Sequence, residues 1–136
     1  MADKLAFVIS PERDNRREVQ NRILEAVKAN GFEGQNFFAI NLALEEALTN
    51  AIKHGNRLDP KKKVKVSAKV SPRRFEIRIE DQGAGFNRKS VPDPTVAENI
   101  EKCSGRGILL IEAYMTEVSW DRGGRRLKMV KLNEPE

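Results

Sequence analysis

Cysteine is almost absent from this chain: Cys103 is the one such residue among 136. A lone cysteine cannot form an intrachain disulfide or supply a cysteine-based metal site, so both kinds of stabilisation are excluded. This composition fits a reducing compartment, and we expect a cytoplasmic protein. Two interpretations of Cys103 stay open: a small residue in a loop, or a redox-active thiol.

Long apolar runs are also lacking. The N-terminal segment MADKLAFVIS is too short in its apolar part for a secretory signal peptide, and no stretch approaches the roughly 18 apolar residues of a membrane span. We therefore expect no membrane partner. A chain of 136 residues has the size of one domain and can bury a core of its own, so we predict a single domain over residues 1–136.

Charge, in contrast, is abundant and unbalanced. The chain has 25 Lys and Arg against 20 Asp and Glu, a net charge of +5, and the excess gathers in KKKVKV (61–66) and RGGRRLK (122–128). Such patches attract phosphates, nucleic acid or acidic proteins. Because these residues alternate with apolar ones, we favour a second interpretation, in which they form solvated strand faces. Nucleic-acid binding is the weakest of our functional hypotheses.

The apolar periodicity, caps and turn residues predict the order βααββ, a long loop, then αββ. This order predicts an α+β fold, a two-layer sandwich in which three helices cover one face of a largely antiparallel mixed sheet. The expected strands are 4–10, 62–70, 74–80, 117–121 and 125–132. The expected helices run from Ser10 or Pro11 to about 29, from 36 to 54, and from Gly105 or Arg106 onward.

The connection over residues 81–105 contains three glycines and two prolines. It is longer than most structureless connections inside a compact domain, so we predict a functional loop or lid, at approximately residues 86–104.

A polar pair lies on the second predicted helix, in the segment EEALTNAIKHGN (45–56). Side chains four residues apart share one face of a helix, so Glu46 and Asn50 point together, with His54 one turn further on. Alone, such a pair is most often a solvated helix face.

Two glycine-containing segments follow. In DQGAG (81–85) a strand ends in an acid beside two glycines, which by itself is typical of a tight turn. In SGRGILLI (104–111) a Gly-x-Gly pair opens an apolar helix, which by itself is typical of a helix N-terminus with permissive glycines.

Together the three segments predict a nucleotide site. Glycines at a helix N-terminus let backbone N–H groups approach phosphates, which the helix dipole also favours. An asparagine oxygen can bind Mg²⁺, and a carboxylate nearby can take a proton from an attacking hydroxyl. An aspartate beside glycines can accept a hydrogen bond from the amino group of adenine.

These segments resemble the boxes of the GHKL, or Bergerat-fold, ATPases, which include gyrase B, heat-shock chaperone ATPases, mismatch-repair ATPases and histidine kinases. EEALTNAIKHG resembles the N-box, DQGAG the first glycine box and GRG the second. FN, VPDPT, ENIEK and SGRGILLIEAYMTEV resemble the lid and following helix of the anti-sigma-factor serine/threonine-protein kinases. The resemblance covers essentially the whole chain and implies the Bergerat fold, with ATP and Mg²⁺ as cofactors.

On the helix, the resemblance implies that Glu46 is the general base and that Asn50 is the Mg²⁺ ligand. Lys53 lies near the same face and is a further nucleotide-binding candidate. His54 matches a histidine common at this place in the family, or it only closes the C-terminal end of the helix.

In the two glycine boxes, the resemblance implies that Asp81 holds the adenine, with glycines shaping that wall, and that the start of the last helix lines the phosphates. The nucleotide-binding candidates here are Asp81, Gly83, Gly85, Gly105, Arg106 and Gly107. One departure concerns the last strand, where the family often has a threonine near the adenine. Residues 124–127 here read Gly-Arg-Arg-Leu.

The resemblance implies an ATP- and Mg²⁺-dependent serine/threonine protein kinase that acts as an anti-sigma factor and partner-switching regulator. Such a protein binds a sigma factor and phosphorylates a small antagonist (anti-anti-sigma) protein, and we expect a homodimer. The helical dimerisation unit of histidine kinases is not seen in the sequence. The alternative function, motivated by the missing threonine, is an ATP-binding or nucleotide-free partner-binding module without kinase activity.

Overall fold

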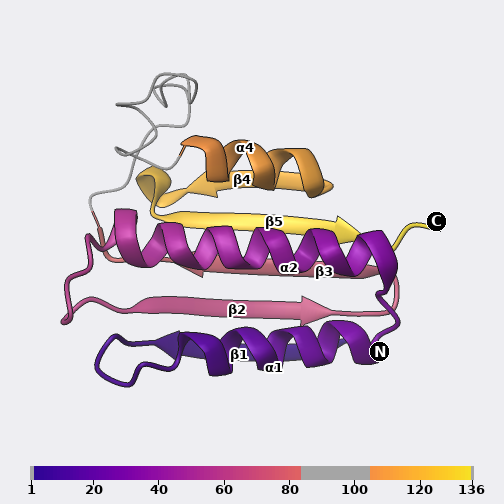
Figure 1. Cartoon of the computed structure of the whole chain (residues 1–136), viewed down its shortest axis with the longest axis horizontal. Coiled ribbons are helices and arrows are strands. Elements are labelled where there is room, and N and C mark those ends of the chain that lie inside the picture. Colours follow the sequence, from indigo (N-terminus) through magenta and orange to yellow (C-terminus); the bar gives the residue numbers. More distant parts are fainter. Residues whose placement is uncertain (1, 84–104, 136) are drawn as a thin grey trace.

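The structure is a computed structural model that describes residues 2–83 and 105–135. The elements follow the predicted order (Figure 1). They are β1 (Asp3–Ile9), α1 (Arg16–Ala29), α2 (Gly34–Thr49), the π-helical segment η1 (Asn50–Gly55), β2 (Val64–Val70), β3 (Arg74–Glu80), α4 (Gly105–Tyr114), β4 (Glu117–Asp121), the short 3₁₀ helix η3 (Arg122–Gly124) and β5 (Arg126–Leu132).

The five strands form one sheet in the order β1-β2-β3-β5-β4. Each neighbouring pair is antiparallel, so the described sheet contains no parallel pair. Helices α1, α2 and α4 cover one face of this sheet (Figure 1). The predicted α+β fold is therefore confirmed, with a sheet that is antiparallel throughout its described part.

The core lies between the helices and the sheet. Along β2 and β3, residues alternate between buried and more exposed, as the period of a strand with one wet face requires. Burying each large apolar side chain contributes about 1.5–3 kcal/mol. Fully buried side chains from both layers are Ile23, Val27, Ile40, Leu44, Leu48, Val66, Val70, Phe75, Ile77, Ile111 and Met129.

The first helix begins later than the sequence predicts. Residues 11–14 form turns, with Asp14 in the left-handed region at φ 49°, and α1 starts at Arg16. The cause is the Asn15 side chain. Its Oδ1 accepts from the Ser10 N–H at 3.0 Å and its Nδ2 donates to the Val8 carbonyl at 2.9 Å, which holds the chain in a loop before the helix.

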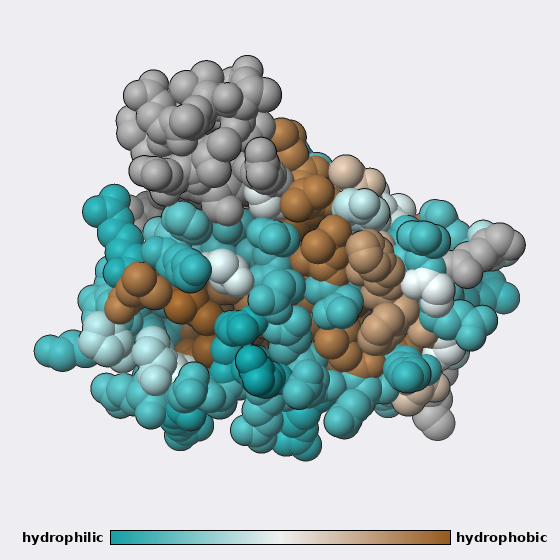
Figure 2. All heavy atoms as spheres, in the orientation of Figure 1, coloured by the Kyte–Doolittle hydropathy of each residue, from teal (hydrophilic) through white to brown (hydrophobic). Residues whose placement is uncertain are grey.

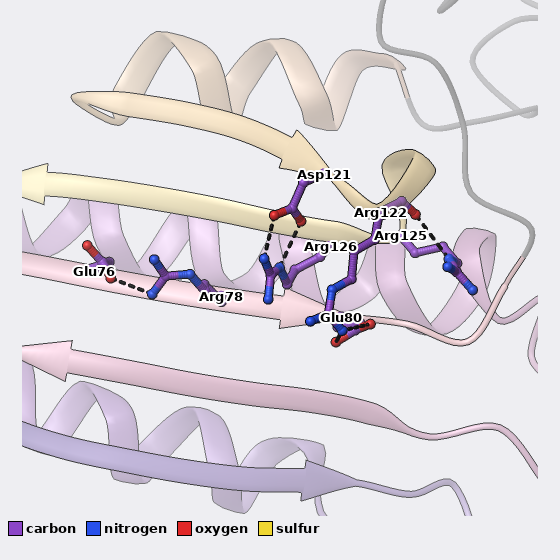
Figure 3. A network of polar contacts seen from close by, with 7 residues as sticks. All are labelled: Glu76, Arg78, Glu80, Asp121, Arg122, Arg125 and Arg126. Atoms are coloured by element: carbon purple, nitrogen blue, oxygen red, sulfur yellow. Dashed lines mark hydrogen bonds and ion pairs between the residues drawn. The ribbon is translucent and has the colours of Figure 1, made fainter.

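The outer face of the sheet carries ion pairs (Figure 3). Glu76 accepts from Arg74 at 2.7 Å and from Arg78 at 2.6 Å. Partial burial alone would raise the pKa of Glu76, but the two guanidinium groups outweigh it and leave that pKa below its usual range. Along β2, Lys65 and Lys69 are exposed, so the interpretation of alternating charges as a solvated strand face is confirmed there.

None of the helices that the structure describes is both long and apolar enough to cross a membrane.

Leu44→Ala should lower the free energy of unfolding by about 2–5 kcal/mol, because Leu44 is fully buried and its truncation leaves a cavity. Urea denaturation measures the change. The matched control is Leu58→Ala at a side chain that is 64% exposed, which should change stability by no more than about 0.5 kcal/mol. Equal losses for the two variants would contradict the packing described here.

Candidate functional site

Three segments that are far apart in the sequence meet at one end of the molecule. They are the end of α2 with η1, the end of β3, and the start of α4 (Figure 1). Every predicted site residue that the structure describes belongs to one of these segments or directly follows it. Gly85, the predicted lid at 86–104 and Cys103 lie outside the described residues.

Glu46 and Asn50 lie one turn apart, at the C-terminal end of α2 and the first position of η1. Glu46 is half-buried, and no described side chain donates a hydrogen bond to its carboxylate. The Oδ1 atom of Asn50 is buried and has no hydrogen-bond partner within residues 2–83 and 105–135. An unsatisfied buried oxygen costs about 1–3 kcal/mol, so a cation or donor from a ligand would recover stability there.

The polar column predicted from Glu46 through Asn50 to His54 does not continue past Asn50. That prediction assumed one α-helix over residues 36–54, whereas residues 50–55 form a π-helical segment. The Asn56 N–H accordingly bonds the Ala51 carbonyl, five residues earlier, at 2.9 Å. A spacing of four residues therefore no longer places side chains above one another in η1.

His54 and Lys53 lie within η1. Burial is the main reason why the pKa of His54 is lowered, and the adjacent charge of Lys53 lowers it further, so the imidazole is neutral near pH 7. Lys53 is exposed. Its role in binding a nucleotide stays a prediction.

Asp81 is enclosed by two glycines. The Gly83 N–H donates to Asp81 Oδ1 at 2.8 Å. A Cβ atom added to Gly55 would collide with the Asp81 carboxylate, and one added to Gly83 would lie 2.6 Å from the carbonyl carbon of Gly55. Only glycine permits this close approach, which joins the end of η1 to the end of β3.

The pKa of Asp81 is raised, and burial is the main cause. The Gly83 N–H and the charge of Arg125 oppose this effect without cancelling it. Asp81 is thus a carboxylate held in one orientation in a partly dry environment.

An asparagine that the sequence reasoning missed holds the same end together. Asn56 is 3% exposed. Its Oδ1 accepts from the Gln82 N–H at 2.6 Å, and its Nδ2 donates to the Lys63 carbonyl at 3.0 Å. Lys63 N–H in turn donates to Gln82 Oε1 at 2.7 Å. The sequence signal was an asparagine directly after a helix-ending glycine, which indicates only a turn.

Helix α4 runs antiparallel to α2 (Figure 1). The rings of Phe38 and Tyr114 meet edge to face, with centroids 5.9 Å apart. An α-helix rises about 1.5 Å per residue, so eight residues cover about 12 Å. Counting eight residues from this contact in the same direction leads forward to Glu46 on α2 and back to Arg106 on α4. The first turn of α4, with Gly105 and the buried Gly107, therefore comes alongside Glu46. The first N–H groups of an α-helix have no partner within the helix itself, so a helix start is suited to an anion.

At the start of the last strand, Arg125 lies next to Asp81, and the apolar Leu127 follows two positions later. The Arg125 carbonyl accepts from the Asp81 N–H at 3.0 Å. Leu127 pairs with Ile79 in the sheet and is buried. The departure noted in the sequence, an absent threonine in this region, thus falls next to Asp81.

The groups of this site suit a ligand that has both anionic oxygens and a ring with polar substituents. It has a helix start for anionic oxygens, a buried amide oxygen for a cation, a carboxylate beside it, and a second carboxylate between glycines.

Comparisons with known proteins agree with this arrangement. The profile of the histidine kinase-like ATPase domain matches residues 9–131, which include all three segments of the site. An anti-sigma F factor of Clostridium perfringens is 31% identical over 100 residues, covering 69% of this chain and 71% of that protein. A serine-protein kinase RsbW of Listeria innocua is 28% identical over 114 residues, covering 78% of this chain and 73% of that protein.

Asn56→Ala should destabilise the protein, because it leaves the Gln82 N–H and the Lys63 carbonyl without partners, at about 1–3 kcal/mol for each unsatisfied group. Urea unfolding measures the loss. Asn41→Ala is the control, since Asn41 is exposed on α2 and its replacement should change stability by about 0.5 kcal/mol or less. If Asn56→Ala unfolds at the wild-type midpoint, the hydrogen bonds of Asn56 contribute nothing to stability.

Proposed function

Because the chain belongs to the histidine kinase-like ATPase family, we propose that it is an ATP- and Mg²⁺-dependent serine/threonine protein kinase acting as an anti-sigma regulator. In this role it binds a sigma factor and phosphorylates a small antagonist protein. The names of the relatives, an anti-sigma F factor and a serine-protein kinase, support the two parts of the proposal. The single observation that carries it is the unsatisfied Oδ1 of Asn50, one turn after Glu46.

Asn50 fits a magnesium ligand. Mg²⁺ takes oxygen ligands, keeps several waters, and binds through few protein groups together with substrate phosphates. A buried amide oxygen that no described group bonds is such an oxygen ligand. When bound, the ion neutralises charge on the phosphate oxygens.

Glu46 is the proposed general base. A base in phosphotransfer accepts the proton of the attacking hydroxyl, and it must reach that proton in the bound complex. No described donor occupies the carboxylate of Glu46, so it is available to a substrate hydroxyl. Its neighbour Glu45 differs, because it accepts from Arg16 at 3.1 Å on the exposed side.

Asp81 is the proposed acceptor for the adenine amino group, and its position between Gly55 and Gly83 supports this role. The start of α4 is the proposed phosphate cradle, with Gly105 and Gly107 allowing close approach and Arg106 adding charge. The partners, the homodimer and the role of Lys53 belong to the same proposal.

One observation favours a second function. The segment next to Asp81 carries Arg125, Arg126 and Leu127, and none of these side chains has a hydroxyl group to offer to an adenine. With fewer polar contacts to adenine, the domain would act as a partner-binding module that holds ATP weakly or not at all.

Glu46→Gln should lower phosphotransfer to the antagonist protein by about 10²–10⁴-fold while ATP binding is retained, because the amide cannot accept the proton. Labelled ATP with candidate small antagonist proteins measures the transfer. Glu45→Gln is the matched control at the adjacent carboxylate and should keep nearly full activity. Wild-type transfer rates in Glu46→Gln would remove Glu46 from the role of base.

Mg-ATP should raise the melting temperature, because a ligand that binds the folded state stabilises it, by about 2.7 kcal/mol at 100 times Kd. In Asn50→Ala the gain that depends on Mg²⁺ should disappear, whereas the gain from ATP in EDTA should persist. A thermal scan with and without Mg²⁺ measures both. No shift with any nucleotide would favour the partner-binding module instead.

A further inference from the structure

Apolar side chains remain exposed on the helical layer, between α2 and α4. Phe38, Leu109 and Tyr114 are 48%, 44% and 38% exposed, and Leu42 and Leu110 beside them are half-buried. Figure 2 shows apolar side chains gathered over these two helices, on a face that is otherwise largely hydrophilic. We call these five residues the apolar band.

The band is ordered rather than scattered. Phe38 and Leu42 are one turn apart on α2, as are Leu110 and Tyr114 on α4. The edge-to-face contact of Phe38 with Tyr114 joins the two rows. Soluble proteins rarely leave contiguous apolar patches exposed unless they bind something, and aromatic residues often contribute most of the energy at such interfaces.

The band leads to the proposed catalytic residue. Phe38, Leu42 and Glu46 follow one another at intervals of four residues on one face of α2. Leu42 thus lies about 6 Å and Phe38 about 12 Å from Glu46 along the helix axis. An apolar row therefore leads along α2 to Glu46, and a protein that delivers a hydroxyl group to Glu46 has this row beside it.

We propose that the apolar band docks the phosphoacceptor protein, an inference that rests on the proposed kinase function. An extended segment rises about 3.3 Å per residue, so residues two and four positions from the acceptor reach Leu42 and Phe38. Those two positions face the same side of an extended chain as the acceptor itself. The substrate therefore carries apolar side chains two and four residues from its reacting serine or threonine.

In the docked complex the acceptor hydroxyl meets Glu46. Its oxygen bonds to the γ-phosphorus of ATP, the bond from that phosphorus to the bridging oxygen breaks, and ADP leaves. Glu46 takes the hydroxyl proton. The band takes no part in these bonds, so its substitution should change protein binding and leave ATP binding intact.

The test uses the double variant Phe38→Ser and Tyr114→Ser, with each candidate small antagonist protein as the probe. The Kd and KM for the antagonist should rise by about tenfold or more, because the loss of aromatic anchors weakens interfaces by this amount. The KM for ATP should stay unchanged. The control is Val8→Ser at an exposed apolar residue of β1, which should change neither constant. The conservative pair Phe38→Leu and Tyr114→Phe should restore binding, which separates docking from misfolding.

Other outcomes overturn the inference. For the double variant, these are unchanged Kd and KM for the antagonist, loss of sigma-factor binding while antagonist binding is retained, or a changed oligomeric mass in sedimentation. For the wild-type protein, the outcome that overturns the inference is that it binds no candidate antagonist. Failure of the proposed function looks different. In that case the wild-type protein binds an antagonist without phosphorylating it, and Kd alone still decides whether the band is the docking surface.

A second readout comes from the phosphorylated protein. Replacing its apolar residues two and four positions from the acceptor by serine should raise KM as the band variant does. Combining these replacements with the band variant should add little further loss, since both remove the same contact. Fully additive losses would place the docking contact elsewhere.

Discussion

The close approach of Gly55, Asp81 and Gly83 is the contact on which the arrangement of the site depends. Elsewhere the helical layer and the sheet are joined mainly by the apolar side chains of the core. At this end, a backbone carbonyl, a carboxylate and a backbone N–H meet without room for a single Cβ atom. Asn56 reinforces the contact with hydrogen bonds to Lys63, just before β2, and to Gln82, just after β3. The end of the helix that carries Glu46 and Asn50 is thereby fixed relative to Asp81.

Helix α2 connects stability with chemistry. One face contributes Ile40, Leu44 and Leu48 to the core, and another face carries Phe38 and Leu42 of the apolar band and then Glu46. The core face holds the helix rigidly, so the polar groups at its end need no flexible loop to position them. The unsatisfied oxygen of Asn50 reduces the stability that this packing provides.

Local patterns in the sequence predicted the element order, the buried face of the sheet and the buried stripe of each helix. They could do so because apolar residues recur every two positions in a half-buried strand and every three or four positions in a half-buried helix. The sequence also singled out the three segments that meet at one end of the molecule, since glycines beside acids and at a helix start are rare enough to notice; their role as a nucleotide site stays a prediction. The start of α1, the π-helical segment and the role of Asn56 were not found. Each depends on hydrogen bonds between residues five or more positions apart, as Asn15 with Ser10 and Asn56 with Gln82 illustrate. The exposure of Phe38 and Leu109 was equally hidden, because an apolar residue on a helix is normally assigned to the core.

Because of the π-helical segment, the number of residues from Asn50 to Gly55 determines where Gly55 lies relative to the sheet. An α-helix continued from Asn50 would need fewer residues to cover the same distance, and Gly55 would then stand at another angle to the sheet. Deleting one residue between Asn50 and Gly55 would convert the wide turn into an ordinary one and carry the glycine carbonyl away from Asp81. A deletion among residues 57–62 would be absorbed by the surface loop. In relatives of this chain, the spacing from asparagine to glycine should therefore vary less than the length of the loop that follows.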